Sequence, residues 1–456
     1  MDTIISSLLS QKNRFGFHYY PDTLHYRDID LAFWLPELTA LGASWLVLRA
    51  PADRAIPESF IRGLIQAGIA PILQFNLPLS KPTPTTELEP LLLAYARWGV
   101  KAILLFDRPN SHHAWSLHIW AQEDLNSRFL ERFVPLANLA LRTGLVPIFP
   151  ALEPGGGYWD TVFLRSALES LAQRNESTIL ENLILAARPW LHGHSLDWGS
   201  GGPDRWPEAH PYCLPKNSED QRGFRIFDWY LAITRAVLGK SCPVILLETG
   251  VSTDPISKQF LPQPVEEQKL IIMTIARLLN DENVFDPEDS GRLLTPLPPE
   301  IISANFWLLA ADSYSPHQSA AWYKTDGSRL SVVQEWMEWM KGIQVRADKS
   351  SQPKTSVVPA GNGSDVSHPI QHYLLLPSYE WGVADWHLEV IRPFVKKHRP
   401  TIGFSLREAR LAERVTVVGN QQTFSEEELQ QLRNMGCEVE RISGDGTSIA
   451  TQLAER

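Results

Sequence analysis

The chain has 456 residues, about three times a typical domain of roughly 150 residues, so it holds one large domain with a smaller one, or two to three ordinary ones. Its composition, 44% hydrophobic and 21% charged, is typical of globular proteins and excludes disordered and fibrous classes. The net charge is −10 and there is no dense Lys/Arg stripe, which argues against sequence-independent binding to nucleic acid. No apolar run reaches the ~18 residues of a membrane span.

The cysteines lie far apart, at Cys213, Cys242 and Cys437, and show neither metal-ligand spacing nor a disulfide framework. We therefore expect no metal and no cofactor. The first residues show no export signal, so a cytoplasmic location is the default expectation. The 16 tryptophans, with 11 tyrosines and 18 phenylalanines, suit either a large core or the binding of sugars, whose apolar faces stack on aromatic rings.

Eight short apolar runs alternate with amphipathic segments over the first 340 residues. Most are continuous apolar runs, as expected for parallel strands that are covered on both faces. The runs are Arg14–Tyr20, Ser44–Ala50, Ile69–Asn76, Val100–Asp107, Leu145–Pro150, Leu183–His192, Pro243–Glu248 and Ile301–Leu308.

Helical patterns lie between these runs, for example over Leu91–Trp98 and Leu125–Thr143. Pro135 stands inside the second pattern, where a proline kinks or breaks a helix. Eight strand-and-helix units in about 330 residues predict an α/β fold, a (β/α)8 TIM barrel. A doubly wound open sheet is the alternative, but the count of eight favours the barrel.

Residues 344–370 are rich in Ser, Pro, Gly, Lys and Asp and show no apolar period, which predicts a flexible linker. The sequence therefore divides into a barrel over 1–343, this linker, and a small Rossmann-like α/β module over 371–456. Two helix starts in the module carry capping boxes, Ser405 with Glu408 and Ser425 with Glu428.

In a (β/α)8 barrel the functional groups gather at the carboxyl ends of the strands. Carboxylates, histidines, an arginine and a tryptophan at one mouth describe a sugar pocket better than a phosphate pocket. The residues at or after these ends include His18, Arg49, Gln74, Asp107, Arg108, Asn110, Glu153, His192, His194, Asp197, Glu248, Asn305 and Trp307.

With LLETG ending the seventh run, an Asp-Arg-Pro-Asn sequence after the fourth and Trp307 on the eighth, residues 14–342 resemble the clan A glycoside hydrolases. The resemblance implies a retaining enzyme in which Glu248 is the nucleophile and Arg49 steadies it. It also implies that His192 is the sixth-strand histidine and that Trp307 forms the floor of the sugar subsite.

The fourth run departs from that family's pattern. Its Asn-Glu-Pro-Asn motif reads Asp107-Arg108-Pro109-Asn110 here, so an arginine stands in place of the acid/base glutamate. A retaining mechanism needs two carboxyl groups, and arginine keeps its proton at every accessible pH. Asp107 is the first candidate to replace the acid, followed by Glu153 and Asp197.

Each candidate also has a plainer interpretation. Glu248 could simply pair with Arg49 or Arg108, and Trp307 could be ordinary core. His192, His194 and Asp197 could ligate a metal, but their spacing makes a weak site. Trp115, Trp159 and Trp198 follow successive strands and could be sugar platforms or loop packing.

The last 45 residues resemble a type 2 cell wall-binding repeat, which implies a cell-envelope polymer as partner and a place at the cell surface. One copy is present, where that family has three in tandem. The matching residues are Val417, Val418, Gly419, Ser425, Leu429, Leu432, Gly436, Val439, Arg441, Ile442, Gly444 and Ala450.

Two functions follow from these expectations. One is a retaining glycoside hydrolase acting on a polysaccharide or oligosaccharide. The other is a catalytically inactive carbohydrate-binding or scaffold barrel, marked by Arg108. A close carboxyl pair that includes Glu248 would favour the first. An arginine bonded to Glu248 without a second usable acid would favour the second.

Overall fold

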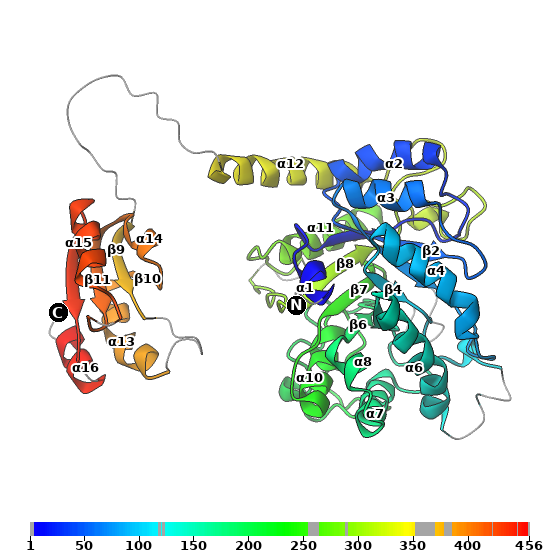
Figure 1. The fold of residues 1–456 in the computed structure, drawn as a ribbon, viewed down its shortest axis with the longest axis horizontal. Helices are drawn as coiled ribbons and strands as arrows, with labels where there is room; N and C mark the ends of the chain where they lie inside the picture. The colour runs from blue at the N-terminus through cyan, green and yellow to red at the C-terminus, as the bar shows by residue number, and fades with distance from the viewer. Residues whose placement is uncertain are drawn as a thin grey trace. The chain divides into compact units, whose positions relative to one another are not determined.

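The computed structural model describes residues 4–116, 120, 124–253, 264–287, 291–351, 370–377, 385–421, 423–444 and 446–454 (Figure 1). The contacts divide the chain into two compact units, Met1–Gln352 and Pro353–Arg456. The first unit contains the eight-stranded barrel, and the second contains a four-stranded sheet.

Eight parallel strands close into a barrel in chain order, and β1 pairs with β8. The TIM barrel prediction is confirmed, and the open sheet is wrong because the first and last strands are bonded. Several strands are shorter than the apolar runs that predicted them. The strands are β1 (Phe15–His18), β2 (Trp45–Ala50), β3 (Ala70–Phe75), β4 (Ala102–Leu104), β5 (Val146–Phe149), β6 (Ile184–Ala187), β7 (Val244–Thr249) and β8 (Ile301–Phe306).

Helices surround the barrel (Figure 1), and α6 continues through Pro135 without a break. None of the described helices is both long and apolar enough to cross a membrane. The helices of this unit are α1 (Ile4–Leu9), α2 (Asp28–Ala40), α3 (Glu58–Gln66), α4 (Thr85–Trp98), α6 (Leu125–Thr143), α7 (Asp160–Gln173), α8 (Ser177–Glu181), α9 (Gly202–Arg205), α10 (Ile226–Leu238), α11 (Val265–Leu279) and α12 (Ser331–Ser351).

Two apolar layers hold the barrel together. Side chains that alternate inward along the strands fill the lumen, with Trp45, Val47 and Ile72 among them. Leu8 of α1 belongs to the same lumen cluster, so this short helix closes the amino end of the barrel. The outward-facing side chains pack against the helices in a second, larger cluster.

An irregularity in β7 positions Glu248. Leu246 pairs with Ala304 and Thr249 with Phe306, so β7 has one residue more than β8 over this stretch. The Asn305 amide donates to the Leu246 carbonyl (2.9 Å), and the Glu248 N–H donates to His18 Nε2 (2.9 Å). A side chain of the neighbouring β8 and one of β1, the strand beyond it, thus satisfy backbone groups of the bulged segment.

The second unit is a parallel sheet in the order β10-β9-β11-β12. Ser425 and Glu428 form the predicted capping box. Ser405 makes no side-chain cap bond, and the Glu408 carboxylate accepts from the Tyr373 hydroxyl (2.7 Å). Its elements are β9 (Ile370–Leu375), α13 (Asp385–His398), β10 (Thr401–Gly403), α14 (Leu406–Ala409), β11 (Ala412–Val418), α15 (Glu426–Asn434), β12 (Glu438–Ile442) and α16 (Gly446–Ala454).

The predicted linker differs from the structure at its start. Helix α12 runs to Ser351, so residues 344–351 of that stretch are helical. The helix-forming Gln, Arg, Ala and Lys of QVRADKSS account for the extension. Residues 352–369 lie outside the described part of the chain.

Position 16 on β1 has room only for glycine, because the Asn305 side chain lies against it. A Cβ at this position would lie 2.2 Å from Asn305 Oδ1 and 2.8 Å from Trp45 Cβ. Gly16→Ala should therefore lower the free energy of unfolding by about 1–3 kcal/mol, because neighbouring strands must move apart. Urea titration followed by tryptophan fluorescence would measure the change.

Gly342→Ala in α12 is the matched control, since no atom lies within 4 Å of its Cβ position. This change should be neutral or slightly stabilising, because alanine is the better helix former. Equal stability of the two variants would contradict the packing argument for Gly16.

Candidate functional site

A buried arginine joins two carboxylates at the carboxyl end of the barrel. Arg188, directly after β6, contacts Glu248 through Nη1 and Asp107 through Nη2. Its side chain is 2% exposed and that of Glu248 is 6% exposed, whereas Asp107 is 19% exposed. One guanidinium therefore holds both candidate catalytic carboxylates in the same small volume.

The charges of this group stabilise one another. Burial alone would raise the pKa of the Asp107 carboxyl, but Arg188 and Arg108 outweigh burial and hold the pKa well below its ordinary value. Glu248 behaves likewise: burial opposes ionisation, and the charge and hydrogen bond of Arg188 lower its pKa. Both carboxyl groups are therefore ionised at neutral pH.

Two further side chains fix the position of Glu248. Trp190 Nε1 donates to Glu248 Oε2 (3.0 Å), while His18 accepts from its backbone N–H. Burial lowers the pKa of His18 to about 3, so the imidazole is neutral and its Nε2 is free to accept.

Three residues of this region have a left-handed backbone conformation, which residues other than glycine rarely adopt. They are Arg108 (φ 43°), His192 (φ 51°) and Glu248 (φ 53°). They follow or end strands β4, β6 and β7. Such conformations cost of order 1–3 kcal/mol each and gather at functional sites.

Arg108, which stands in place of the acid/base glutamate, turns toward carboxylates other than Glu248. Its Nε contacts Asp107 Oδ2 (3.1 Å), and its Nη1 lies 3.9 Å from Glu153 Oε2. Glu153 is held through its backbone, which exchanges two hydrogen bonds with the fully buried Asn110 amide. Asn110 therefore fastens the loop after β5 to the loop after β4.

The other predicted residues fall into two groups. His18 and Trp307 lie together, with ring centroids 5.1 Å apart. Burial lowers the pKa of Arg49, although the charges of Asp107 and Glu248 oppose that shift. His192 hydrogen-bonds Thr253 (2.9 Å) and lies edge-on to Trp190. These residues surround the Arg188 group.

His194 and Asp197 make their contacts elsewhere. His194 stacks on Trp198, with centroids 3.8 Å apart, and Asp197 pairs with the buried Arg225 (3.0 Å). Asp197 connects two loops, because Thr295 of another loop also donates to its carboxylate. Trp115 likewise is engaged in its own loop, where it donates to the Pro109 carbonyl (2.7 Å).

Several polar atoms of the inward-facing layer have no hydrogen-bond partner among the described residues. They are Arg49 Nη1, both amide atoms of Gln74, and Asn305 Oδ1. Gln74 is only 1% exposed, and an inward-facing amide at that depth is normally bonded. These atoms retain both donor and acceptor capacity at the mouth of the barrel.

Arg188 and Trp190 were missed in the sequence because they lay inside a run taken as strand. Within the apolar run LILAARPWLH, the strand itself ends at Ala187. Pro189 was the available signal: a proline has no N–H to donate to a strand ladder, which made a strand end before it more probable than a strand through it.

Two other features lie away from this group. A cavity of about 650 Å³ opens at the amino end of the barrel, between α1 and the segments before β1 and β8. In this fold that end serves stability. A second cluster, Asp22, His25 and Asp312, brings ligand atoms within 4.8 Å of one another, but the two ring nitrogens of His25 face different carboxylates.

No protein-family model matches the chain, and no curated protein matches it in sequence. Among solved structures, Bacteroides uniformis β-glucuronidase 2 aligns with a TM-score of 0.45 and 12% identity, covering 81% of this chain and 38% of that one. The β-galactosidase of Marinomonas ef1 gives a TM-score of 0.34 and 8% identity over 95% of this chain and 76% of that one. An L-ribulose 3-epimerase aligns with a TM-score of 0.36 and 10% identity, covering 76% of this chain and 100% of that one.

The chain spans 38%, 50% and 44% of the length of the three β-glucuronidases it matches. The neighbours include hydrolases and epimerases.

Removal of Arg188 should reverse the pH dependence of stability. The pKa values of Asp107 and Glu248 lie below the ordinary value of about 4, so their ionisation stabilises the wild-type fold above that pH and the contribution is lost as the pH falls. Arg188→Met should destabilise the barrel by about 3–5 kcal/mol at pH 7. Burial then raises both pKa values, so part of this loss should return toward pH 5.

Free energies of unfolding at several pH values would measure both effects. Arg62→Met, which removes an exposed ion pair with Glu58, is the control and should change stability by less than about 1 kcal/mol. If the free energy of unfolding varies with pH equally in Arg188→Met and the wild type, Arg188 does not hold Asp107 and Glu248 ionised.

Proposed function

We propose that the barrel binds a carbohydrate at the carboxyl end of its strands and does not hydrolyse it. The observation that carries this proposal is Arg188, whose guanidinium forms ion pairs with both Asp107 and Glu248. Retaining hydrolysis by Glu248, with Asp107 as the acid, is the competing function, and the closeness of these two carboxylates favours it.

Hydrolysis requires a nucleophile that reaches the sugar and an acid that gives up a proton near the working pH. The Glu248 carboxylate is already engaged by Arg188 and Trp190. Asp107 has a lowered pKa and carries no proton to donate at neutral pH. Arg108 cannot act as an acid because a guanidinium stays protonated.

A carbohydrate suits the polar atoms that remain. Sugar hydroxyls both donate and accept hydrogen bonds, as does the Gln74 amide, and Arg49 adds a donor. Trp307 lies beside His18 but is buried in an apolar cluster with Trp190 and Leu308, so the polar atoms, and not a stacked ring, support the proposal. The resemblance of the strand ends to clan A glycoside hydrolases supports the same class of ligand.

The C-terminal unit fits this proposal. Its β11–α15–β12–α16 segment carries the residues that resemble a cell wall-binding repeat, and Arg441 on β12 bonds the Phe424 carbonyl (2.6 Å) before α15. A binding barrel and an envelope-binding unit on one chain would act together as an adhesion or scaffold protein.

The release of reducing ends from a broad panel of oligo- and polysaccharides tests the proposal. We expect no release by the wild type above the level of Glu248→Gln, with binding of at least one saccharide by both proteins. Release that disappears in Glu248→Gln would establish a retaining hydrolase instead, and Asp107 would be the first acid to replace.

Gln74 provides a test of the binding site that leaves the fold intact. In Gln74→Met the affinity for the best ligand of the panel should fall about tenfold or more, the equivalent of one or two neutral hydrogen bonds. The free energy of unfolding should stay the same or rise, because a buried amide without partners is replaced by an apolar chain.

The control is Gln66→Met at the exposed end of α3, which should leave affinity unchanged. Calorimetric titration of the three proteins gives the comparison. Unchanged affinity in the Gln74 variant would place the ligand away from this layer.

A further inference from the structure

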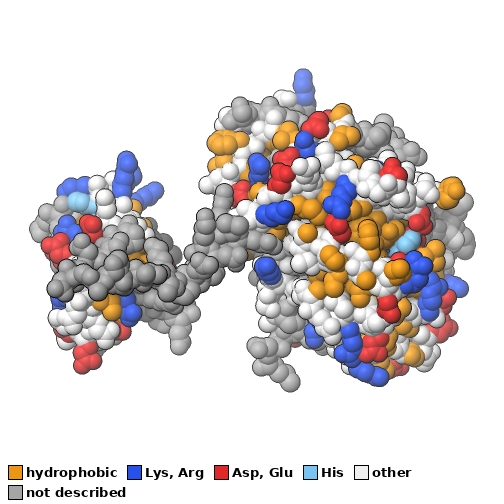
Figure 2. Space-filling view, turned by 90° about the horizontal axis from the view of Figure 1, so that it is seen from above, with side chains coloured by type: hydrophobic (Ala, Val, Ile, Leu, Met, Phe, Trp, Pro, Cys, Tyr) orange, Lys and Arg blue, Asp and Glu red, His pale blue; other side chains and the backbone are white. Residues whose placement is uncertain are grey.

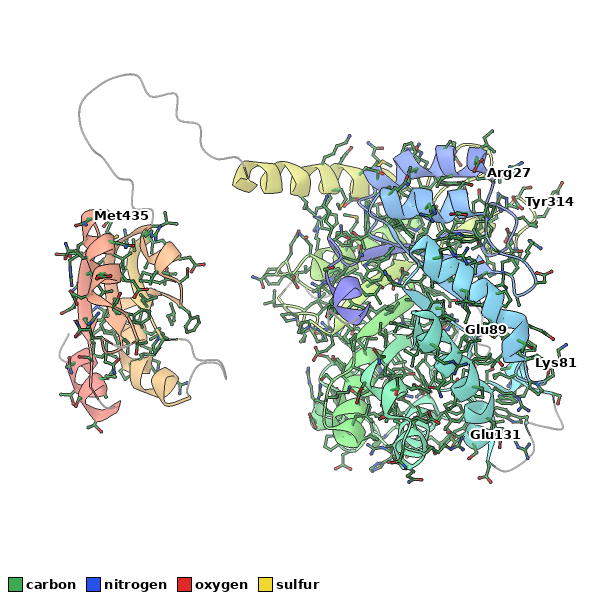
Figure 3. All side chains as sticks on the ribbon, in the orientation of Figure 1. Arg27, Lys81, Glu89, Glu131, Tyr314 and Met435 are labelled. Carbon is green, nitrogen blue, oxygen red and sulfur yellow. The ribbon has the colours of Figure 1, made fainter. Side chains whose placement is uncertain are left out.

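An arginine belongs to the layer of side chains that faces the barrel interior. Arg49 stands near the carboxyl end of β2, two residues after Val47 of the lumen cluster. Because side chains alternate along a strand, Arg49 faces the same side as Val47. Other charged residues of this unit, such as Arg27, Glu89 and Glu131, are exposed and point outward (Figure 3). Arg49 is therefore a cation directed into the barrel.

The Arg49 guanidinium has no bonded partner in the described part of the chain. Its Nη1 is buried without a hydrogen bond, and no carboxylate of a described residue lies within ion-pairing distance of it. The charges of Asp107 and Glu248 act on Arg49, but both carboxylates are bonded to Arg188 instead. Burial of a cation that lacks such a partner costs free energy. A ligand that supplied the partner would recover that cost.

Gln74 lies directly beside Arg49. The two residues are paired in the register of β2 and β3, and neighbouring strands of a sheet lie about 4.8 Å apart. Neither amide atom of Gln74 has a hydrogen-bond partner among the described residues, although this residue is only 1% exposed. A charged donor group and a neutral amide thus stand side by side on the inner face of the barrel.

These two groups match an acidic substituent on a hydroxyl-rich ring. A guanidinium has five N–H donors and no acceptor, and its planar fork fits the two oxygens of a carboxylate or a sulfate. A neutral hydroxyl also accepts a hydrogen bond, but it leaves the charge of Arg49 uncompensated. The Gln74 amide can donate to the same oxyanion, while its Oε1 accepts from a neighbouring hydroxyl.

The attraction for an acidic ligand is local to this pair. The whole chain carries a net charge of −10, and basic and acidic side chains are interspersed over the barrel unit on the face that Figure 2 shows. Asp107 and Glu248 would repel an anion, but Arg188 pairs with both and Arg108 with Asp107. Selectivity for an anion therefore depends on Arg49.

We propose that the saccharide bound at the barrel mouth carries an acidic group, a carboxylate or a sulfate ester, that pairs with Arg49 and Gln74. This inference rests on the proposed function and adds the charge class of the ligand. Carboxylates and sulfates offer the same pair of oxygens to a guanidinium, so the ligands of the test include both.

Calorimetric titration of the full chain with matched saccharides tests the proposal. Oligouronates are compared with their methyl esters, which keep the backbone and lose the charge. Neutral oligosaccharides are compared with their 6-O-sulfated forms. The wild type should bind at least one acidic form about 10- to 100-fold more tightly than its uncharged counterpart, the effect of a hydrogen bond to a charged group.

Three variants assign this preference to Arg49. In Arg49→Met the acidic and uncharged forms should bind equally. Arg49→Lys keeps the charge and loses the planar fork, so the preference should shrink about 2- to 10-fold, and this variant decides the matter if Arg49→Met proves unstable in thermal unfolding. Arg62→Met, which removes an exposed guanidinium of α3, is the matched control and should keep the full preference.

The outcomes separate this inference from the proposed function. Equal binding of acidic and uncharged saccharides by the wild type would overturn the inference and leave the proposed function standing. A preference that stays unchanged in both Arg49 variants, or that Arg62→Met removes equally, would have the same consequence. If no saccharide of either kind binds, the proposed function fails and this inference fails with it.

Discussion

The site depends on the burial of one guanidinium between two carboxylates. Three charged groups within a largely closed barrel mouth would each be costly alone, because the interior solvates ions poorly. Together Arg188, Asp107 and Glu248 satisfy one another, and Trp190 takes up a remaining acceptor of Glu248. The arrangement keeps both carboxylates ionised, which suits binding better than proton transfer.

The backbone around Glu248 is held by neighbouring strands in a connected series. Gly16 leaves space for the Asn305 side chain, the Asn305 amide bonds the β7 carbonyl at Leu246, and His18 accepts the N–H of Glu248. The left-handed conformation of Glu248 persists because these contacts hold the Leu246 carbonyl and the Glu248 N–H. The series links the packing of β1 directly to the orientation of the site carboxylate.

The two halves of the barrel mouth differ in their chemistry. On the side of β4 to β7, arginines and carboxylates are paired, with Arg108 between Asp107 and Glu153. On the side of β2, β3 and β8, polar atoms of Arg49, Gln74 and Asn305 are buried without hydrogen-bond partners among the described residues. Under the proposed function, a hydroxyl-rich ligand would bond these atoms.

The periodicity of the sequence determined the barrel, because buried parallel strands require continuous apolar runs whatever their neighbours are. It also indicated which residues end or follow the strands, and the structure places His18, Arg49, Asp107, Glu248 and Trp307 at or after those ends. Which of these groups touch was decided by tertiary structure alone. Arg188 reaches Asp107 across 81 positions in the chain, and His18 reaches Glu248 across 230, pairings that no local pattern encodes. The closure of the sheet creates these contacts, and with them the lowered pKa values of Asp107 and Glu248.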